Sequence, residues 1–116
     1  MGEIEEYLQR GIALKTDGQY DEAAAEFLKV ISVNDGYDEA HRQLGLVYGF
    51  AGLFDESIEE LKKAVGLNPM NLGARNDLAL TYAMLGMCDE AKAEFTTVLQ
   101  MDPANEVAKR EMVYFC

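Results

Sequence analysis

Three acidic pairs are the residues of this sequence best suited to acid–base chemistry. They recur every 34 residues, as Asp21-Glu22, Asp55-Glu56 and Asp89-Glu90. Two neighbouring carboxylates can serve as a general acid and a general base. Each pair, however, opens an apolar stretch with helical spacing, where negative charge complements the helix dipole. We therefore interpret the pairs as helix-start signals and not as catalytic carboxylates.

Histidine and cysteine offer little further material for chemistry. The one histidine, His41, and the two cysteines, Cys88 and Cys116, are too few and too widely spaced for a zinc site. The sequence has no motif of a serine hydrolase, zinc protease, nucleotide-binding loop or calcium loop. We expect a protein that is not an enzyme and that uses no metal or cofactor, with His41 packed on a helix.

The spacing of the acidic pairs belongs to a period that runs along the whole chain. Gly18, Gly52 and Gly86 recur at the same interval, each after a segment of helix-forming residues. Glycine is favoured just past a helix end, because the chain there often takes a positive φ. The period predicts two helices per unit, the first at about 3–16, 39–50 and 72–84. The second helices are expected at about 21–33, 55–67 and 89–101, and a last helix from about residue 106.

Side-chain size along the period predicts how the helices pack. The second helices carry apolar or small residues at helical spacing, which we expect to be buried: Ala23, Phe27, Val30 and Ile31; Ser57, Leu61, Ala64 and Val65; Ala91, Phe95, Val98 and Leu99. Small residues recur in the first helices at Gly11, Gly45 and Ala79. We expect them to let paired helices approach closely.

Composition excludes several classes of partner. With 116 residues, 49% of them hydrophobic, the chain is expected to form one ordered domain. Its formal net charge is −11, from 21 acidic and 10 basic residues. This charge argues against nucleic acid and anionic membranes as partners and favours an apolar or basic one. The first residues lack the basic and apolar segments of a signal peptide, so the cytoplasm is the expected location.

The repeated residues resemble the tetratricopeptide repeat, whose period is 34 residues. Its first-helix pattern of a bulky residue, Leu, a small residue and Tyr is matched by His41, Leu44, Gly45 and Tyr48, and by Arg75, Leu78, Ala79 and Tyr82. Its second-helix pattern is matched best in the last unit, by Gly86, Cys88, Ala91, Phe95, Val98 and Pro103. The resemblance implies one all-α domain over 1–116, a right-handed α-solenoid of seven helices in antiparallel pairs. Its repeats would cover about 4–37, 38–71 and 72–105, with a C-terminal helix over 106–116.

The same resemblance implies a concave face lined by the first helices. One position on that face holds Ile12, Leu46 and Leu80 in the three units and Tyr114 in the last helix. These residues form an apolar ladder, which is separate from the residues that are expected to pack between the helices. Such a ladder predicts a groove for a partner unless neighbouring side chains or the chain's own tail cover it. The predicted peptide-binding residues are Leu8, Ile12, Arg42, Gln43, Leu46, Phe50, Asn76, Leu80 and Met84.

Some members of this family bind the acidic C-termini of heat-shock chaperones with a carboxylate clamp of Lys, Asn and Arg side chains. The matching positions here hold Leu8, Ile12, Gln43, Gly73 and Asp77. Only Gln43 could imitate its counterpart. The predicted function is therefore a protein–protein interaction scaffold that holds an extended or helical segment by apolar anchors.

The C-terminus leaves other functions open. The chain ends in five apolar residues, Met112–Cys116. They could pack back on the third unit, form a homo-oligomer through the C-terminal helix, or mark a cut in a longer array. A self-association module is thus the main alternative. A chaperone for a hydrophobic secreted protein is a further one, supported by general architecture alone.

Overall fold

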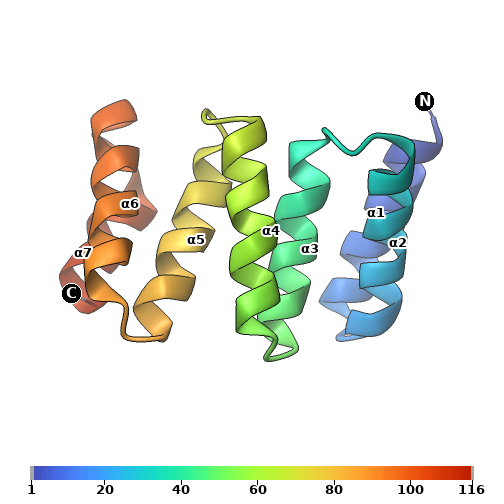
Figure 1. Ribbon diagram of the computed structural model, residues 1–116, viewed down its shortest axis with the longest axis horizontal. Coiled ribbons are helices and arrows are strands. Elements are labelled where there is room, and N and C mark those ends of the chain that lie inside the picture. Colours follow the sequence, from blue (N-terminus) through green and yellow to red (C-terminus); the bar gives the residue numbers. More distant parts are fainter. Residues whose placement is uncertain (1, 116) are drawn as a thin grey trace.

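The structure is a computed structural model that describes the backbone of residues 2–115 and the side chains of residues 2–111. These residues form helices that stack in antiparallel pairs (Figure 1). The helices are α1 (Glu3–Thr16), α2 (Tyr20–Val33), α3 (Asp38–Phe50), α4 (Phe54–Leu67), α5 (Leu72–Met84), α6 (Cys88–Met101) and α7 (Glu106–Phe115). The predicted all-α solenoid of seven helices is confirmed. Tyr114 and the packing of the 112–116 tail lie outside the described side chains.

The turn inside each helix pair is closed by a glycine. Gly18, Gly52 and Gly86 have φ values of 81°, 83° and 78°. The residue after each glycine donates its N–H to the carbonyl oxygen five residues earlier, over 2.8 Å. Because only glycine takes this φ at little cost, the three positions fix where the first helix of each pair ends. The turns lie along one edge of the molecule, at the bottom of Figure 1.

Glycine also sets the distance between paired helices. A Cβ atom built on Gly11 would lie 2.5 Å from Cε1 of Phe27, and one on Gly45 would lie 2.8 Å from Cγ of Leu61. Neither position has room for a side chain. The prediction that small residues let the paired helices approach closely is therefore confirmed.

The buried side chains form two apolar clusters. The N-terminal core comprises Leu8, Ala23, Phe27, Val30, Ala40, Leu44 and Val47. The C-terminal core comprises Leu61, Leu78, Ala79, Tyr82, Ala83, Ala91, Phe95, Val98 and Ala108. The predicted second-helix residues are buried, except that Ile31, Val65 and Leu99 are only half-buried. Each core spans more than one unit, as expected of an array whose single units cannot bury a face alone.

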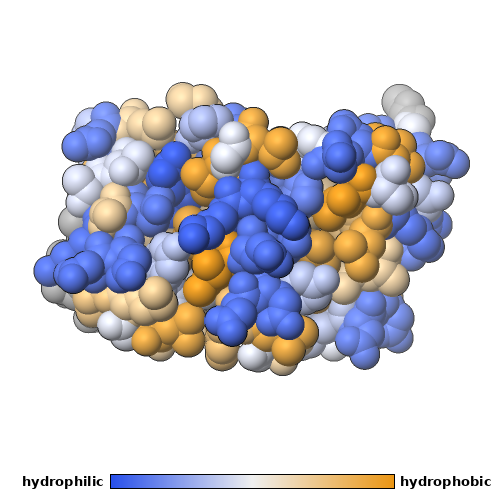
Figure 2. Space-filling model, viewed as in Figure 1, coloured by the Kyte–Doolittle hydropathy of each residue, from blue (hydrophilic) through white to orange (hydrophobic). Residues whose placement is uncertain are grey.

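The helices form an inner and an outer layer. α1 contacts α3, α3 contacts α5 and α5 contacts α7, so these helices make a continuous inner layer. α2, α4 and α6, which are fully described, make no contact with one another. Hydrophilic side chains form a column over α4, with apolar side chains beside it (Figure 2). Among the described residues, no helix combines the length and the apolar character that a membrane crossing would require.

Candidate functional site

The inner layer carries the apolar ladder that the sequence predicts. Ile12 on α1, Leu46 on α3 and Leu80 on α5 are each half-buried. Ile12 packs against the N-terminal core and Leu80 against the C-terminal core. Ile12 and Leu80 therefore each rest on a core, and all three residues keep part of their surface exposed.

A cavity opens beside two rungs of this ladder. It has a volume of about 150 Å³ and is lined by Leu46, Gly49, Phe50, Phe54, Ser57, Asp77, Leu80, Thr81 and Met84. Phe50 and Met84 are 57% and 62% exposed, which is unusual for large apolar side chains that border a cavity. An apolar cavity of this volume can hold a ring-sized group. We call it the groove cavity; it has room for one Leu, Met or Phe side chain of a partner.

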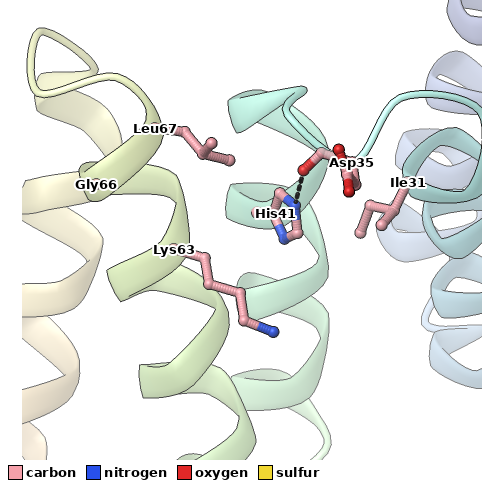
Figure 3. Close-up of a pocket in the computed structure, with 6 residues that line it drawn as sticks. All are labelled: Ile31, Asp35, His41, Lys63, Gly66 and Leu67. Carbon is pink, nitrogen blue, oxygen red and sulfur yellow. Dashed lines mark hydrogen bonds between the residues drawn. The ribbon is translucent and has the colours of Figure 1, made fainter.

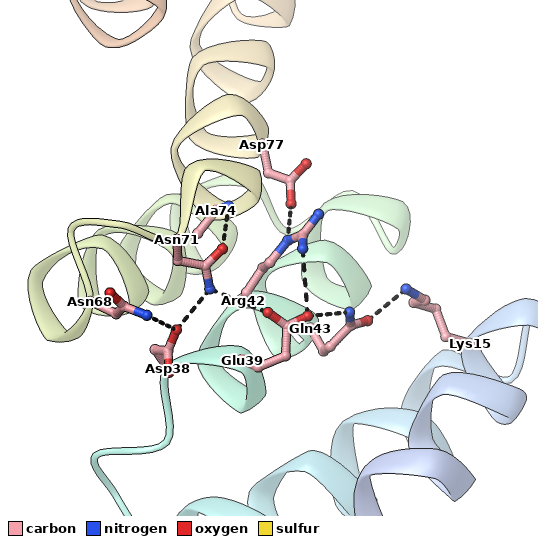
Figure 4. A network of polar contacts seen from close by, with 9 residues as sticks. All are labelled: Lys15, Asp38, Glu39, Arg42, Gln43, Asn68, Asn71, Ala74 and Asp77. Atoms are coloured by element: carbon pink, nitrogen blue, oxygen red, sulfur yellow. Dashed lines mark hydrogen bonds and ion pairs between the residues drawn. The ribbon is translucent and has the colours of Figure 1, made fainter. Parts of the chain in front are cut away.

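A chain of polar contacts crosses the inner layer next to this cavity (Figure 4). Lys15 on α1 donates to Oε1 of Gln43 on α3 over 2.6 Å, and Gln43 donates to Oε2 of Glu39 over 2.9 Å. Arg42 lies 3.5 Å from Glu39 and donates to Oδ2 of Asp77 on α5 over 2.7 Å. The five side chains form the groove network, which connects the first helices of all three units.

Gly73 leaves the space that Arg42 occupies. A Cβ atom on Gly73 would lie 2.6 Å from the guanidinium carbon of Arg42. The guanidinium therefore lies against the α5 backbone, within reach of Asp77. Any side chain at position 73 would displace Arg42 from this place.

Burial shifts the ionisation of two residues in the groove network. It lowers the pKa of Lys15, and the positive charge of Arg42 lowers it further. Burial also raises the pKa of Asp77, and the hydrogen bond and charge of Arg42 offset only part of that rise. The groove thus holds charged groups at a cost in solvation that their mutual contacts partly offset.

The raised pKa of Asp77 predicts a pH dependence of stability. The folded chain holds the proton of the Asp77 carboxyl group more tightly than the unfolded chain does. The stabilisation that this provides is fully present below the usual aspartate pKa of about 4. It is lost as pH rises through the folded-state value. The free energy of unfolding of the parent should therefore fall relative to that of Asp77→Asn as the pH rises above about 4. Urea denaturation at a series of pH values measures the difference, and a difference that stays constant or grows with pH contradicts the prediction.

Most of the predicted site residues keep some surface on the inner layer, whereas Leu8 is buried. The side chain of Leu8 is 8% exposed and belongs to the N-terminal core, which leaves it little surface for contact with a peptide. Gln43 and Asn76 are also buried. Gln43 is held by the groove network, and Asn76 donates to Oδ1 of Asn105 over 3.1 Å. Ile12, Arg42, Leu46, Phe50, Leu80 and Met84 keep surface on the inner layer.

The sequence prediction missed other residues of the site. Lys15, Glu39 and Asp77 were not among the predicted peptide-binding residues, although their charges complete the groove network. Phe54 lies on a second helix and still lines the groove cavity. The only available signal for Phe54 was its position, two residues after the turn glycine Gly52.

The helix pairs, their register and the inner layer agree with a sequence comparison. The profile of the tetratricopeptide repeat matches residues 5–37, 39–71 and 72–105. The chain belongs to the tetratricopeptide-repeat family. It is accordingly a protein–protein interaction domain, the coarse function that its sequence predicts. A search of curated proteins finds no significant match.

Solved tetratricopeptide-repeat domains have the same fold. The first such domain of Spaghetti (RPAP3), bound to the HSP90 peptide SRMEEVD, is 21% identical, with a TM-score of 0.91 over 97% of this chain and 90% of that one. The second domain of human RPAP3, in complex with the HSP70 peptide SGPTIEEVD, is 21% identical, with a TM-score of 0.89 over 97% and 94%. The Arabidopsis OM64 domain is 20% identical, with a TM-score of 0.90 over 98% and 97%. At such identities the likeness extends to the fold alone.

Proposed function

We propose that this tetratricopeptide-repeat domain binds an extended or helical peptide segment on its inner layer and anchors it by an apolar side chain in the groove cavity. The observation that carries the proposal is the exposure of Phe50 and Met84 at the rim of that cavity, above the half-buried Leu46 and Leu80. Exposed apolar surface that surrounds a cavity is typical of interaction sites. Apolar anchors in a groove between helices are an established mode of peptide recognition.

The groove network argues for an apolar or basic partner rather than an acidic one. Two of the similar domains hold chaperone peptides that end in EEVD. Here the two cations of the groove, Lys15 and Arg42, already bond to Gln43 and Asp77. An incoming carboxylate would have to share these cations with Glu39 and Asp77, which carry the same charge as itself.

The clamp positions lead to the same conclusion. Of the residues at those positions, Leu8 is core, Gly73 lies under Arg42, and Asp77 carries the wrong charge. Gln43, which could imitate an asparagine, is engaged on both of its amide atoms. At none of these four positions is there an unengaged Lys, Arg or Asn side chain of the kind that the clamp requires.

Peptide display followed by direct binding tests this proposal. Peptides from a random 12-residue library are selected on the domain, and the best is compared with SRMEEVD by fluorescence polarisation. We expect selected peptides rich in apolar residues three or four apart, with at least tenfold higher affinity than SRMEEVD. If SRMEEVD binds as tightly as the selected peptide, the domain recognises acidic tails and the proposal fails.

Self-association is the competing function for the same apolar surface. Sedimentation velocity at several protein concentrations separates the two. A monomer at concentrations where the selected peptide is bound leaves the groove available to a partner. A dimer that the selected peptide dissociates would show instead that a second copy occupies the groove.

A further inference from the structure

A second cavity lies on the side of the molecule formed by the outer helices. It is found between α2 and α4, which make no contact with each other, and has a volume of about 500 Å³. Its lining residues are Ile31, Asp35, His41, Lys63, Gly66 and Leu67 (Figure 3). None of them lines the groove cavity. We call this space the outer cavity.

The polar wall of the outer cavity is fixed by contacts within the chain. His41 is 6% exposed; its Nε2 donates to the carbonyl oxygen of Asp35 over 2.8 Å, and its Nδ1 lies 2.7 Å from Oε1 of Glu60. Lys63 donates to the other carboxylate oxygen of Glu60 over 3.4 Å. Both ring nitrogens of His41 therefore face an acceptor, and Glu60 is the shared partner of His41 and Lys63 in this wall.

The absence of a side chain at Gly66 keeps the outer cavity open, although nothing in the fold requires a glycine at this position. It lies in α4, one residue before the end of the helix, and its φ is not positive. A Cβ atom built there would meet no other atom within 4 Å. Neither backbone conformation nor packing requires a glycine, which is unfavourable within a helix. The equivalent positions of the other units, Ser32 and Gln100, carry side chains.

The remaining groups at the outer cavity define the chemistry of a ligand. Ile31 and Leu67 supply apolar surface, and Leu67 is 47% exposed. The carboxylate of Asp35 is exposed, and it makes no hydrogen bond or ion pair with another described residue. Of the charged side chains that line this cavity, Lys63 is bonded to Glu60, whereas the carboxylate of Asp35 has no partner among the described residues, in a chain of formal net charge −11. This complements an apolar side chain flanked by cations.

We propose that the outer cavity is a second peptide-binding site, which receives a leucine-like side chain flanked by Lys or Arg from a partner protein. The partner's apolar side chain lies against Ile31 and Leu67, over the bare backbone of Gly66. A flanking cation pairs with the carboxylate of Asp35. The site is independent of the groove cavity, which lies among α3, α4 and α5.

The probe for this site is the tripeptide acetyl-Lys-Leu-Lys-amide, titrated into isotope-labelled full-length protein and followed through backbone amide NMR shifts. We expect saturating shifts at Ile31, Gly66 and Leu67. Acetyl-Glu-Leu-Glu-amide, the matched acidic peptide, should shift these amides at least fivefold less at equal concentration. No saturating shift with the basic peptide, or equal shifts with both peptides, would overturn the proposal.

A single substitution separates binding from folding. Gly66→Gln places a side chain in the outer cavity and replaces glycine with a better helix former, so the unfolding temperature should equal or exceed that of the parent. The basic tripeptide should nevertheless lose its saturating shifts. Asp35→Asn should weaken binding at least threefold, because it removes the negative charge that pairs with the flanking cation and keeps the size of the side chain. Undiminished binding by Gly66→Gln would overturn the proposal.

The groove serves as the control site. The double variant Leu46→Asp with Phe50→Asp alters the groove cavity and leaves every residue of the outer cavity in place. It should bind the basic tripeptide as the parent does. If it loses these shifts while Gly66→Gln retains them, the tripeptide binds in the groove and the outer cavity is not a site. Selected groove peptides that still bind Gly66→Gln would show the two sites to be separate.

Discussion

Ala91→Arg is expected to unfold the C-terminal half of the array. Ala91 on α6 is 1% exposed and is part of the C-terminal core with Phe95 and Ala79. A long charged side chain at this position would have to be buried without a partner or push α6 away from α5. Either outcome should cost about 3 kcal/mol or more of the free energy of unfolding. Such a loss is a large fraction of the total stability of a small domain.

Ala93→Arg is the matched control for Ala91→Arg. Ala93 lies on the same helix, two residues further along, and is exposed. It should accept an arginine with a change of about 0.5 kcal/mol or less. Urea denaturation followed by circular dichroism measures both variants. If Ala91→Arg denatures at the same urea concentration as Ala93→Arg, the register of α6 against α5 is not as described.

Leu46→Asp combined with Phe50→Asp is expected to abolish binding of the peptide selected on the groove. Leu46 and Phe50 both line the groove cavity, and Phe50 is the exposed side chain on its rim. Apolar anchors at the centre of an interface commonly contribute about 2 kcal/mol or more, which is a roughly thirtyfold loss of affinity for each. Two added carboxylates also make the cavity polar. The ring of Phe50 lies 5.9 Å from that of Tyr20, so a small loss of stability should accompany the loss of binding.

Glu56→Lys with Glu59→Lys provides the comparison on the outer layer. Both residues are exposed on α4, and neither lines the groove cavity. This double variant raises the net charge by four, whereas the groove variant lowers it by two, so it tests whether a change of charge outside the groove cavity affects binding. It should bind the selected peptide within about twofold of the parent, since exposed charges far from an interface act weakly through water. Retained binding by the folded Leu46→Asp and Phe50→Asp variant would exclude the groove cavity as the anchor site.

Most of the fold could be predicted because the period marks the helix ends. Gly18, Gly52 and Gly86 end the first helix of each pair, and α5 starts and ends at the predicted residues. The second helices begin one residue earlier than predicted, at Tyr20, Phe54 and Cys88. Their cap residues make no side-chain cap hydrogen bond, so the sequence holds no capping signal for the first residue. The acidic pairs mark the first turn and not its first residue.

The candidate site was harder to predict, because it depends on how residues pair. The positions of Lys15, Arg42 and Asp77 on the inner layer follow from the period, whereas their hydrogen bonds depend on side-chain conformations that spacing does not determine. Leu8 shows a second limit: its unit position matches Arg42 and Asn76, but its apolar side chain packs into the N-terminal core. The contact of His41 with the buried Glu60 was also not predictable from spacing, because it joins two residues that are 19 positions apart on different helices.

The separation of the outer helices has a mechanical consequence. The inner layer is continuous, whereas α2, α4 and α6 do not touch. Each unit is joined to the next chiefly where its second helix packs on the following first helix, α2 on α3 and α4 on α5, so these contacts set the curvature of the stack. The rotation between neighbouring units thus also sets how closely α1, α3 and α5 approach one another on the inner layer, where the hydrogen bonds of Lys15 and Arg42 cross from helix to helix.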